Sequence, residues 1–143
     1  MNIIKKIAKV NELPHITDLI HDCWFDVDEI VFDHQTSVLS IRFEKELPES
    51  IQTLRKILFI KKKTIPIAEY FLKIHHVQDY KIDDQNQIGK YDFNKLEYMQ
   101  EKQIIIINTG VPIGIEIKVG SFEVSVEKSG KILKERKFLS IFN

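Results

Sequence analysis

The densest group of chemically capable side chains lies in the eleven residues 19–29. This junction segment holds the only Cys and the only Trp of the chain, together with one His and four acidic residues. Carboxylates and imidazoles can bind metals or transfer protons, and a thiol beside an imidazole can act as a nucleophile. The junction lies in a wider acidic segment, residues 11–41, which contains seven Asp and Glu and no Lys or Arg. We therefore expect any site of this protein to include the junction.

A metal site would draw on the carboxylates of the junction. Asp26 and Asp28 are two residues apart, so on a regular strand they would share one face. Their spacing matches no calcium-loop pattern, however, and the sequence has no Gly for the sharp turn of such a loop. A structural zinc site needs four ligands, and this chain has only one Cys to offer. The pattern favours a solvated acidic surface, and we predict no metal and no other cofactor.

The thiol chemistry depends on a helix that we expect over residues 14–24, with Pro14 in its first turn. His21 lies on the polar side of this helix, about 200° around the axis from Cys23, so the two cannot form a catalytic pair. We interpret Cys23 as a small buried residue and Trp24 as a core residue. The alternative for Trp24 is an exposed anchor for a partner. The apolar stripe of the helix comprises Leu13, Ile16, Leu19, Ile20, Cys23 and Trp24.

The polar side of the junction remains as the candidate binding surface. Only one of the neighbours His75 and His76 could join it, because adjacent residues of a strand point to opposite faces. No catalytic motif is present, so we assign no catalytic residue. The candidate binding residues are His21, Asp22, Asp26, Asp28 and His76.

Basic residues gather at residues 61–63 and 128–137. Proteins that bind single-stranded nucleic acid combine such a basic surface with exposed aromatic side chains. The whole chain is neutral, however, with 21 basic and 21 acidic residues, and only three of the basic ones are Arg. These numbers argue against nucleic acid as a partner, and lysines that protect an edge strand explain the clusters equally well.

Length and composition indicate one domain that spans residues 1–143. The longest aliphatic run, residues 104–107, is far too short to cross a bilayer, and the N-terminus lacks the apolar core of a signal peptide. We therefore expect a soluble, cytoplasmic protein with no membrane partner. The 24 Ile and the excess of Lys over Arg are typical of an AT-rich bacterial genome.

Beyond the helix, apolar and polar residues alternate with the period of β-strands. A hairpin is expected about a turn at residues 33–37, and a second about Gly120, in which Ile117 would face Val124. Residues 129–130 would turn the chain again before a last strand at 132–141. Residues 79–89 indicate a loop. Further strands are expected at 54–61, 65–77, 91–99 and 103–108, with a short helix over 66–72 as an alternative.

These elements predict an α+β fold. The N-terminal amphipathic helix would pack on a large, mostly antiparallel meander sheet, whose size favours curling into a partial barrel.

Three functions remain open. We favour a small non-enzymatic interaction module, because segregated charge in a neutral chain can orient a protein partner or drive self-association. The alternative is a metal-assisted hydrolase or other small-molecule enzyme, which would need His21, Asp22 and Asp26 to meet His76 in one cleft. Single-stranded nucleic-acid binding is the third.

Overall fold

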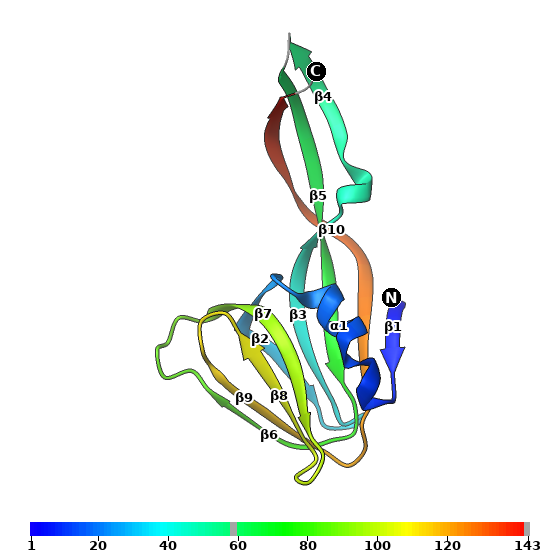
Figure 1. Ribbon diagram of the computed structural model, residues 1–143, viewed down its shortest axis with the longest axis vertical. Helices are drawn as coiled ribbons and strands as arrows, with labels where there is room; N and C mark the ends of the chain where they lie inside the picture. Colours follow the sequence, from blue (N-terminus) through cyan, green and yellow to red (C-terminus); the bar gives the residue numbers. More distant parts are fainter. Residues whose placement is uncertain (58–59, 142–143) are drawn as a thin grey trace.

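The computed structural model describes residues 1–57 and 60–141 (Figure 1). Within these residues the chain forms ten antiparallel strands and one α-helix, α1 (Leu13–Ile20), which confirms the predicted α+β class. Two 3-10 turns, η1 (Val10–Glu12) and η2 (Pro48–Ser50), precede α1 and β4. The strands are β1 (Asn2–Ile7), β2 (Trp24–Asp33), β3 (Val38–Glu46), β4 (Gln52–Ile57), β5 (Ile60–Ile74), β6 (Val77–Asp83), β7 (Lys90–Met99), β8 (Ile104–Thr109), β9 (Gly114–Val119) and β10 (Val124–Ile141).

The strands form one open sheet in the order β1-β10-β5-β3-β2-β7-β8-β9-β6, and β4 pairs with β5 off this path. The hairpins β2–β3, β7–β8 and β8–β9 connect consecutive strands, as in a meander. β5 continues into β6 through a short bend, and β9 continues into β10 through another. The half with β6 to β9 therefore turns away from the half with β3, β5 and β10 (Figure 1).

α1 packs on β7 and β10 and contributes to the core of this body. Its buried residues Leu13, Ile16 and Ile20 recur at helical spacing, which confirms that part of the predicted stripe. Beneath the helix, Phe25 stacks on Phe93 with 4.4 Å between ring centroids. Aromatic and β-branched residues from several strands thus share one core with the helix.

The helix is shorter than predicted. It ends at Ile20, and Asp22 adopts a left-handed backbone conformation with φ of 64°. The N–H of Asp22 donates to the carbonyl of Phe93, and the N–H of Phe93 donates to the carbonyl of Cys23, both at 2.9 Å. These bonds to β7 replace the next helical turn, so Trp24 begins a strand.

Two predictions about the sheet are wrong because strands pair with distant partners. The predicted loop at 79–89 contains most of β6, in which Ile82 pairs with Ile115 of β9. β9 and β10 do not form a hairpin: Ile117 pairs with β6 and β8, and Val124 with β1 and β5. The strands predicted from alternating apolar residues do form, but this alternation does not specify which strand pairs with which.

Three other boundaries differ from prediction. Residues 129–130 lie inside β10 at a register shift and do not end a strand. Residues 66–72 are strand, which excludes the short helix. The expected strand at 54–61 is divided between β4 and β5, and residues 58–59 lie outside the described part of the chain. The N-terminal strand β1 was not anticipated.

The outer parts of β5 and β10, together with β4, project from the body as a three-stranded arm (Figure 1). We define the arm as residues 51–57, 60–67 and 131–141. It contains nine Lys and Arg and one Glu, a formal charge of +8, so the rest of this neutral chain carries −8. The two basic clusters of the sequence therefore meet largely in one projecting element. No helix in the described residues is long and apolar enough to cross a membrane.

Candidate functional site

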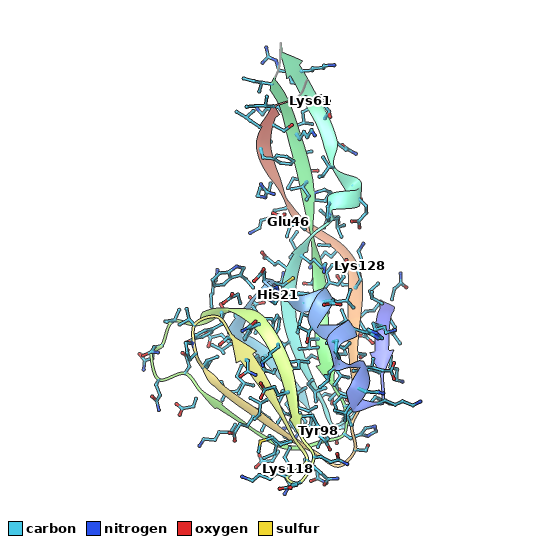
Figure 2. The ribbon with its side chains drawn as sticks, in the orientation of Figure 1. His21, Glu46, Lys61, Tyr98, Lys118 and Lys128 are labelled. Carbon is cyan, nitrogen blue, oxygen red and sulfur yellow. The ribbon has the colours of Figure 1, made fainter. Side chains whose placement is uncertain are left out.

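The junction segment lies where α1 passes into β2, close to the base of the arm. His21 caps the end of α1, and its Nδ1 lies 3.1 Å from Oδ2 of Asp22. Both side chains are exposed. Figure 2 shows His21 near the arm base, and Glu46 of β3 lines the same hollow of the surface. The helix end thus places two of the predicted binding residues beside an element far away in the sequence.

Trp24 is exposed, which corrects its predicted place in the core. Its residue is 55% accessible to solvent, whereas the next residue, Phe25, is 3% accessible. The prediction assumed that the helix continued to Trp24. Because β2 begins at Trp24, consecutive side chains point to opposite faces, and only Phe25 turns inward. The structure therefore agrees with the alternative prediction, in which the Trp24 side chain is exposed.

Two hollows adjoin Trp24, and Trp24 and Glu44 line both. The smaller has a volume of about 100 Å³ and includes Asp26 and Glu29 of β2. The larger, about 480 Å³, includes His21 and Asp22. We call these two hollows together with the Trp24 side chain the Trp24 groove. The groove presents one large apolar surface within a charged rim.

Ion pairs fix the smaller hollow. The Arg42 guanidinium donates from Nη1 to Glu29 at 2.9 Å and from Nε to Glu69 at 2.5 Å. The hydrogen bond to Glu69 raises the pKa of Arg42, and the same bond lowers the pKa of Glu69. Lys134 lies 3.3 Å from Glu44. These bonds hold the charged walls in place, as a preformed recognition surface requires.

The larger hollow is held by contacts between the body and the arm. Arg136 donates to both carboxylate oxygens of Glu46, and this hydrogen bonding lowers the pKa of Glu46. Lys45 Nζ donates to the carbonyl of Leu19 at 2.5 Å, in the last turn of α1. The base of the arm and the end of the helix are therefore both tied to β3.

Cys23 also lines the larger hollow, but its environment suppresses thiol chemistry. Its side chain is partly buried against the core, and Sγ lies 3.9 Å from the carbonyl oxygen of Leu19. Burial raises the pKa of the Cys23 thiol, an effect that the Lys45 charge opposes only in part. A thiol that resists ionisation is a poor nucleophile.

Asp26 and Asp28 lie in an irregular part of β2. The pairing of β2 with β3 shifts register between Phe25 and Ile30, and Asp26 Oδ1 accepts a hydrogen bond from the Asp28 N–H at 2.9 Å. Asp26 lines the smaller hollow, whereas Asp28 is exposed beside it. The bulge therefore interrupts the regular pairing of β2 with β3 at both carboxylates.

His76 lies beyond the C-terminal end of β5, away from the groove. The seven steps along β5 from Ile67, which lines the groove, to Ile74 span roughly 23 Å, and His76 lies beyond them. There its Nε2 is 3.8 Å from Glu123, and His75 contacts Ser125 Oγ at 2.9 Å. The structure therefore brings His21, Asp22 and Asp26 around Trp24 but leaves His76 elsewhere. In the described ranges, no three His, Cys, Asp or Glu side chains are grouped so that they could hold a metal ion.

Sequence reasoning missed the groove residues that other strands supply. Arg42, Glu44 and Lys45 come from β3, and Lys134 comes from β10. The one available signal was Arg42 itself, the first basic residue after the acidic segment. In comparisons with protein-family models, curated proteins and solved structures, none matched this chain.

Proposed function

We propose that this protein is a non-enzymatic interaction module that binds another polypeptide in the Trp24 groove. The observation that carries the proposal is the exposure of the only Trp of the chain, which lines two hollows. Trp is enriched among the residues that dominate binding energy at protein interfaces. An exposed indole contributes nothing to the core, so its value to the protein is best explained by a partner that covers it.

The groove chemistry suggests the kind of segment that it binds. An apolar side chain of the partner would lie on the indole of Trp24. Cationic side chains would face the carboxylates of Asp22 and Asp26, two acidic residues of the segment that contains no Lys or Arg. His21 and Asp28 complete the polar rim. An apolar centre with a polar rim is the usual organisation of a protein interface.

An enzymatic role has weaker support. The hydrolase alternative required His76 to approach His21 and Asp22, and His76 lies beyond the C-terminal end of β5, away from the groove. The thiol of Cys23 has a raised pKa. We also retain a cytoplasmic location, a bacterial source and a single domain as proposals, which the sequence composition supports.

The test is capture by the immobilised full chain, with wild type, Trp24→Ala and a control variant compared side by side. Val111→Ala is a suitable control because Val111 is also an exposed apolar residue and does not line the groove. We expect Trp24→Ala to lose specifically bound polypeptide, including any second copy of the chain, while Val111→Ala retains it. Binding that survives Trp24→Ala unchanged would show that the groove is not the recognition surface.

A further inference from the structure

We propose that the far end of the arm binds the surface of a bilayer rich in anionic lipid. This inference goes beyond the proposed function, because it concerns a surface that shares no residue with the Trp24 groove. Three features carry it: aliphatic side chains exposed at the arm end, basic side chains without ion pairs directly behind them, and an arm long enough to hold the acidic body away from an anionic surface.

The far end of the arm exposes three aliphatic side chains. Ile60 pairs with Ile141 in the outermost described pair of β5 and β10, and residues that pair directly across antiparallel strands share a face. Leu139 is two residues from Ile141 in β10, so it lies on the same face. Ile60, Leu139 and Ile141 are 47%, 68% and 84% accessible, respectively. Three such side chains gathered at one projecting end indicate an interaction site.

Basic side chains lie directly behind these aliphatic residues on the same face. Lys62 pairs with Leu139 of β10 and with Arg55 of β4. Lys137 is two residues behind Leu139 in β10, so it shares the face. All three cations are exposed, and among the residues that the structure describes none of them forms an ion pair. We define the tip patch as Arg55, Ile60, Lys62, Lys137, Leu139 and Ile141.

The arm cations that do form ion pairs lie elsewhere. Lys134 lies 3.3 Å from Glu44 at the base of the arm. Arg136 pairs with Glu46, also at the base. By the register of β5 with β10, Lys134 and Arg136 lie on the face opposite to the tip patch. The charges of the tip patch are therefore available to an anionic partner without breaking the contacts between arm and body.

An anionic bilayer surface offers both contacts in the order in which the tip patch presents them. The apolar part of the patch extends from Ile141 back to Leu139, roughly 7 Å along the strand. Apolar groups of proteins at a membrane interface are buried to roughly 5–10 Å. The cationic ends of Lys62 and Arg55 would then lie at the lipid phosphates, with their stems beside Leu139. Because only side chains enter the acyl layer, the open edges of β4 and β10 keep their hydrogen bonds to water.

The length of the arm separates the tip patch from the acidic body. The seven steps along β5 from Ile60 to Ile67, the residue that pairs with Glu46 of β3, span roughly 23 Å. Figure 2 shows Lys61, next to Ile60, near the far end of the arm and Glu46 at its base. The Debye length at physiological ionic strength is about 8 Å. End-on contact therefore uses the +8 of the arm, while salt screens the repulsion of the −8 on the rest of the chain.

This binding needs no segment that crosses the membrane. The expectation of no membrane partner followed from the lack of a long aliphatic run in the sequence. Attachment to a surface depends instead on apolar and basic side chains that the fold exposes together. The pairing of β4, β5 and β10 brings those side chains to one end of the arm from distant parts of the chain.

Two other anionic partners fit the tip patch less well. A nucleic acid would place Leu139 and Ile141 against charged phosphates, because phosphate contacts dominate such binding. An acidic protein would need a cavity with an apolar floor and an acidic rim, shaped to receive a projecting end. The bilayer surface has a charged layer over an apolar one at every point, so it fits a projecting apolar end with basic residues behind it.

The test is sedimentation of the full chain with lipid vesicles at roughly 0.1 M salt. One set of vesicles contains phosphatidylcholine alone, and the other contains equal amounts of phosphatidylcholine and phosphatidylglycerol. We expect wild type to bind the vesicles with phosphatidylglycerol at least tenfold more tightly than the neutral vesicles. Raising the salt concentration should weaken this binding, because it screens the attraction between the basic residues and the lipid.

A charge variant tests the basic part of the tip patch. Lys62→Glu with Lys137→Glu should bind vesicles with phosphatidylglycerol at least tenfold more weakly than wild type. The matched control, Lys9→Glu with Lys102→Glu, changes the net charge by the same amount at exposed positions of the body. It should bind as wild type does, because these positions lie outside the arm.

An apolar variant tests the insertion of side chains. Leu139→Ser with Ile141→Ser leaves the net charge unchanged and should also weaken binding at least tenfold. Its matched control, Ile88→Ser with Val111→Ser, removes exposed apolar side chains of the body and should bind as wild type does. Circular dichroism and thermal unfolding of all four variants show whether a loss of binding reflects loss of the fold.

Three outcomes would overturn the inference: a wild type that does not bind vesicles with phosphatidylglycerol, binding that the charge variant retains, or binding that the apolar variant retains in full. In the first case, binding of a labelled duplex oligonucleotide that the charge variant abolishes would assign the arm to nucleic acid instead. The proposed function fails separately, when polypeptide captured by the chain stays bound to Trp24→Ala.

Discussion

Trp24 and Phe25 are neighbours in β2 whose side chains serve opposite surfaces of the sheet. Phe25 is 3% accessible and stacks on Phe93, whereas Trp24 is 55% accessible and lines both hollows of the groove. Phe25 therefore contributes to the stability of the fold, whereas Trp24 contributes to the proposed recognition surface. Mutation can test the two roles independently.

We predict that Phe25→Ala lowers the free energy of unfolding by about 3–5 kcal/mol, because it leaves a cavity beside Phe93. Trp24→Ala should change it by less than about 1 kcal/mol, since an exposed side chain contributes little to the core. Urea unfolding of the two variants at low protein concentration measures the difference. Equal destabilisation would contradict the assignment of Trp24 to the surface.

The Arg42–Glu69 pair should make stability depend on pH. The hydrogen bond from Arg42 lowers the pKa of Glu69 in the fold below its unfolded value. Its contribution is therefore present above the unfolded pKa, about 4.3, and is lost as the pH falls through the lower folded pKa.

We predict that Glu69→Gln costs about 1 kcal/mol at pH 7, and that this cost shrinks as the pH falls below about 4. Denaturant unfolding of wild type and variant from pH 7 to pH 3 checks this. A cost that does not vary with pH would show that the carboxylate charge is not what stabilises the pair.

Cys23 should react slowly in the folded protein. Burial raises the pKa of its thiol, so less thiolate is present at pH 8 than for a free thiol. We expect reaction with a disulfide reagent at pH 8 to be at least tenfold slower in the native chain than in urea. Because the chain has one Cys, the signal reports this site alone. Equal rates in both states would mean that the thiol is neither buried nor perturbed.

The sequence indicated the local character of most elements but not their partners. The alternation of Ile115 and Ile117 identified β9 correctly, yet its neighbours are β6 and β8 rather than β10. Alternation reports which face a residue occupies, and many strands can satisfy it equally well. The long-range pairing of β5 with β10, which creates the arm, has no local signature.

The candidate site was predicted only in part, for the same physical reason. His21, Asp22 and Asp26 were singled out because they follow one another in the chain, and they do line the groove. Trp24 was misplaced because a helix wheel was applied one turn too far, across the point where bonds to Phe93 end the helix. Lys134 enters from β10, far away in the sequence, so no spacing could have joined it to the junction. Arg42 comes from β3, the hairpin partner of β2, but the register shift between Phe25 and Ile30 hides its position from the sequence.

Gly130 should be required where β10 leaves the body. Its φ of 89° is a conformation that residues with a Cβ rarely adopt, although no neighbouring atom lies within 4 Å of an added Cβ. We predict that Gly130→Ala costs about 1 kcal/mol through the backbone alone. Gly114→Ala, where an added Cβ would make an ordinary contact with Asp83, is the matched control and should be near neutral. Thermal unfolding measures the stability of both variants. Equal destabilisation would show that the backbone conformation of Gly130 is not the cause.

The most direct test of the Trp24 groove as the recognition surface is the fluorescence emission of Trp24, the only indole in the chain. An exposed indole emits at long wavelength, and a partner that covers it shifts the emission to shorter wavelength. We predict a blue shift when polypeptide eluted from the immobilised chain is added to wild type, and no shift with material eluted from an empty matrix. Emission that stays unchanged while the polypeptide binds would contradict the account, because the partner would then bind without covering Trp24.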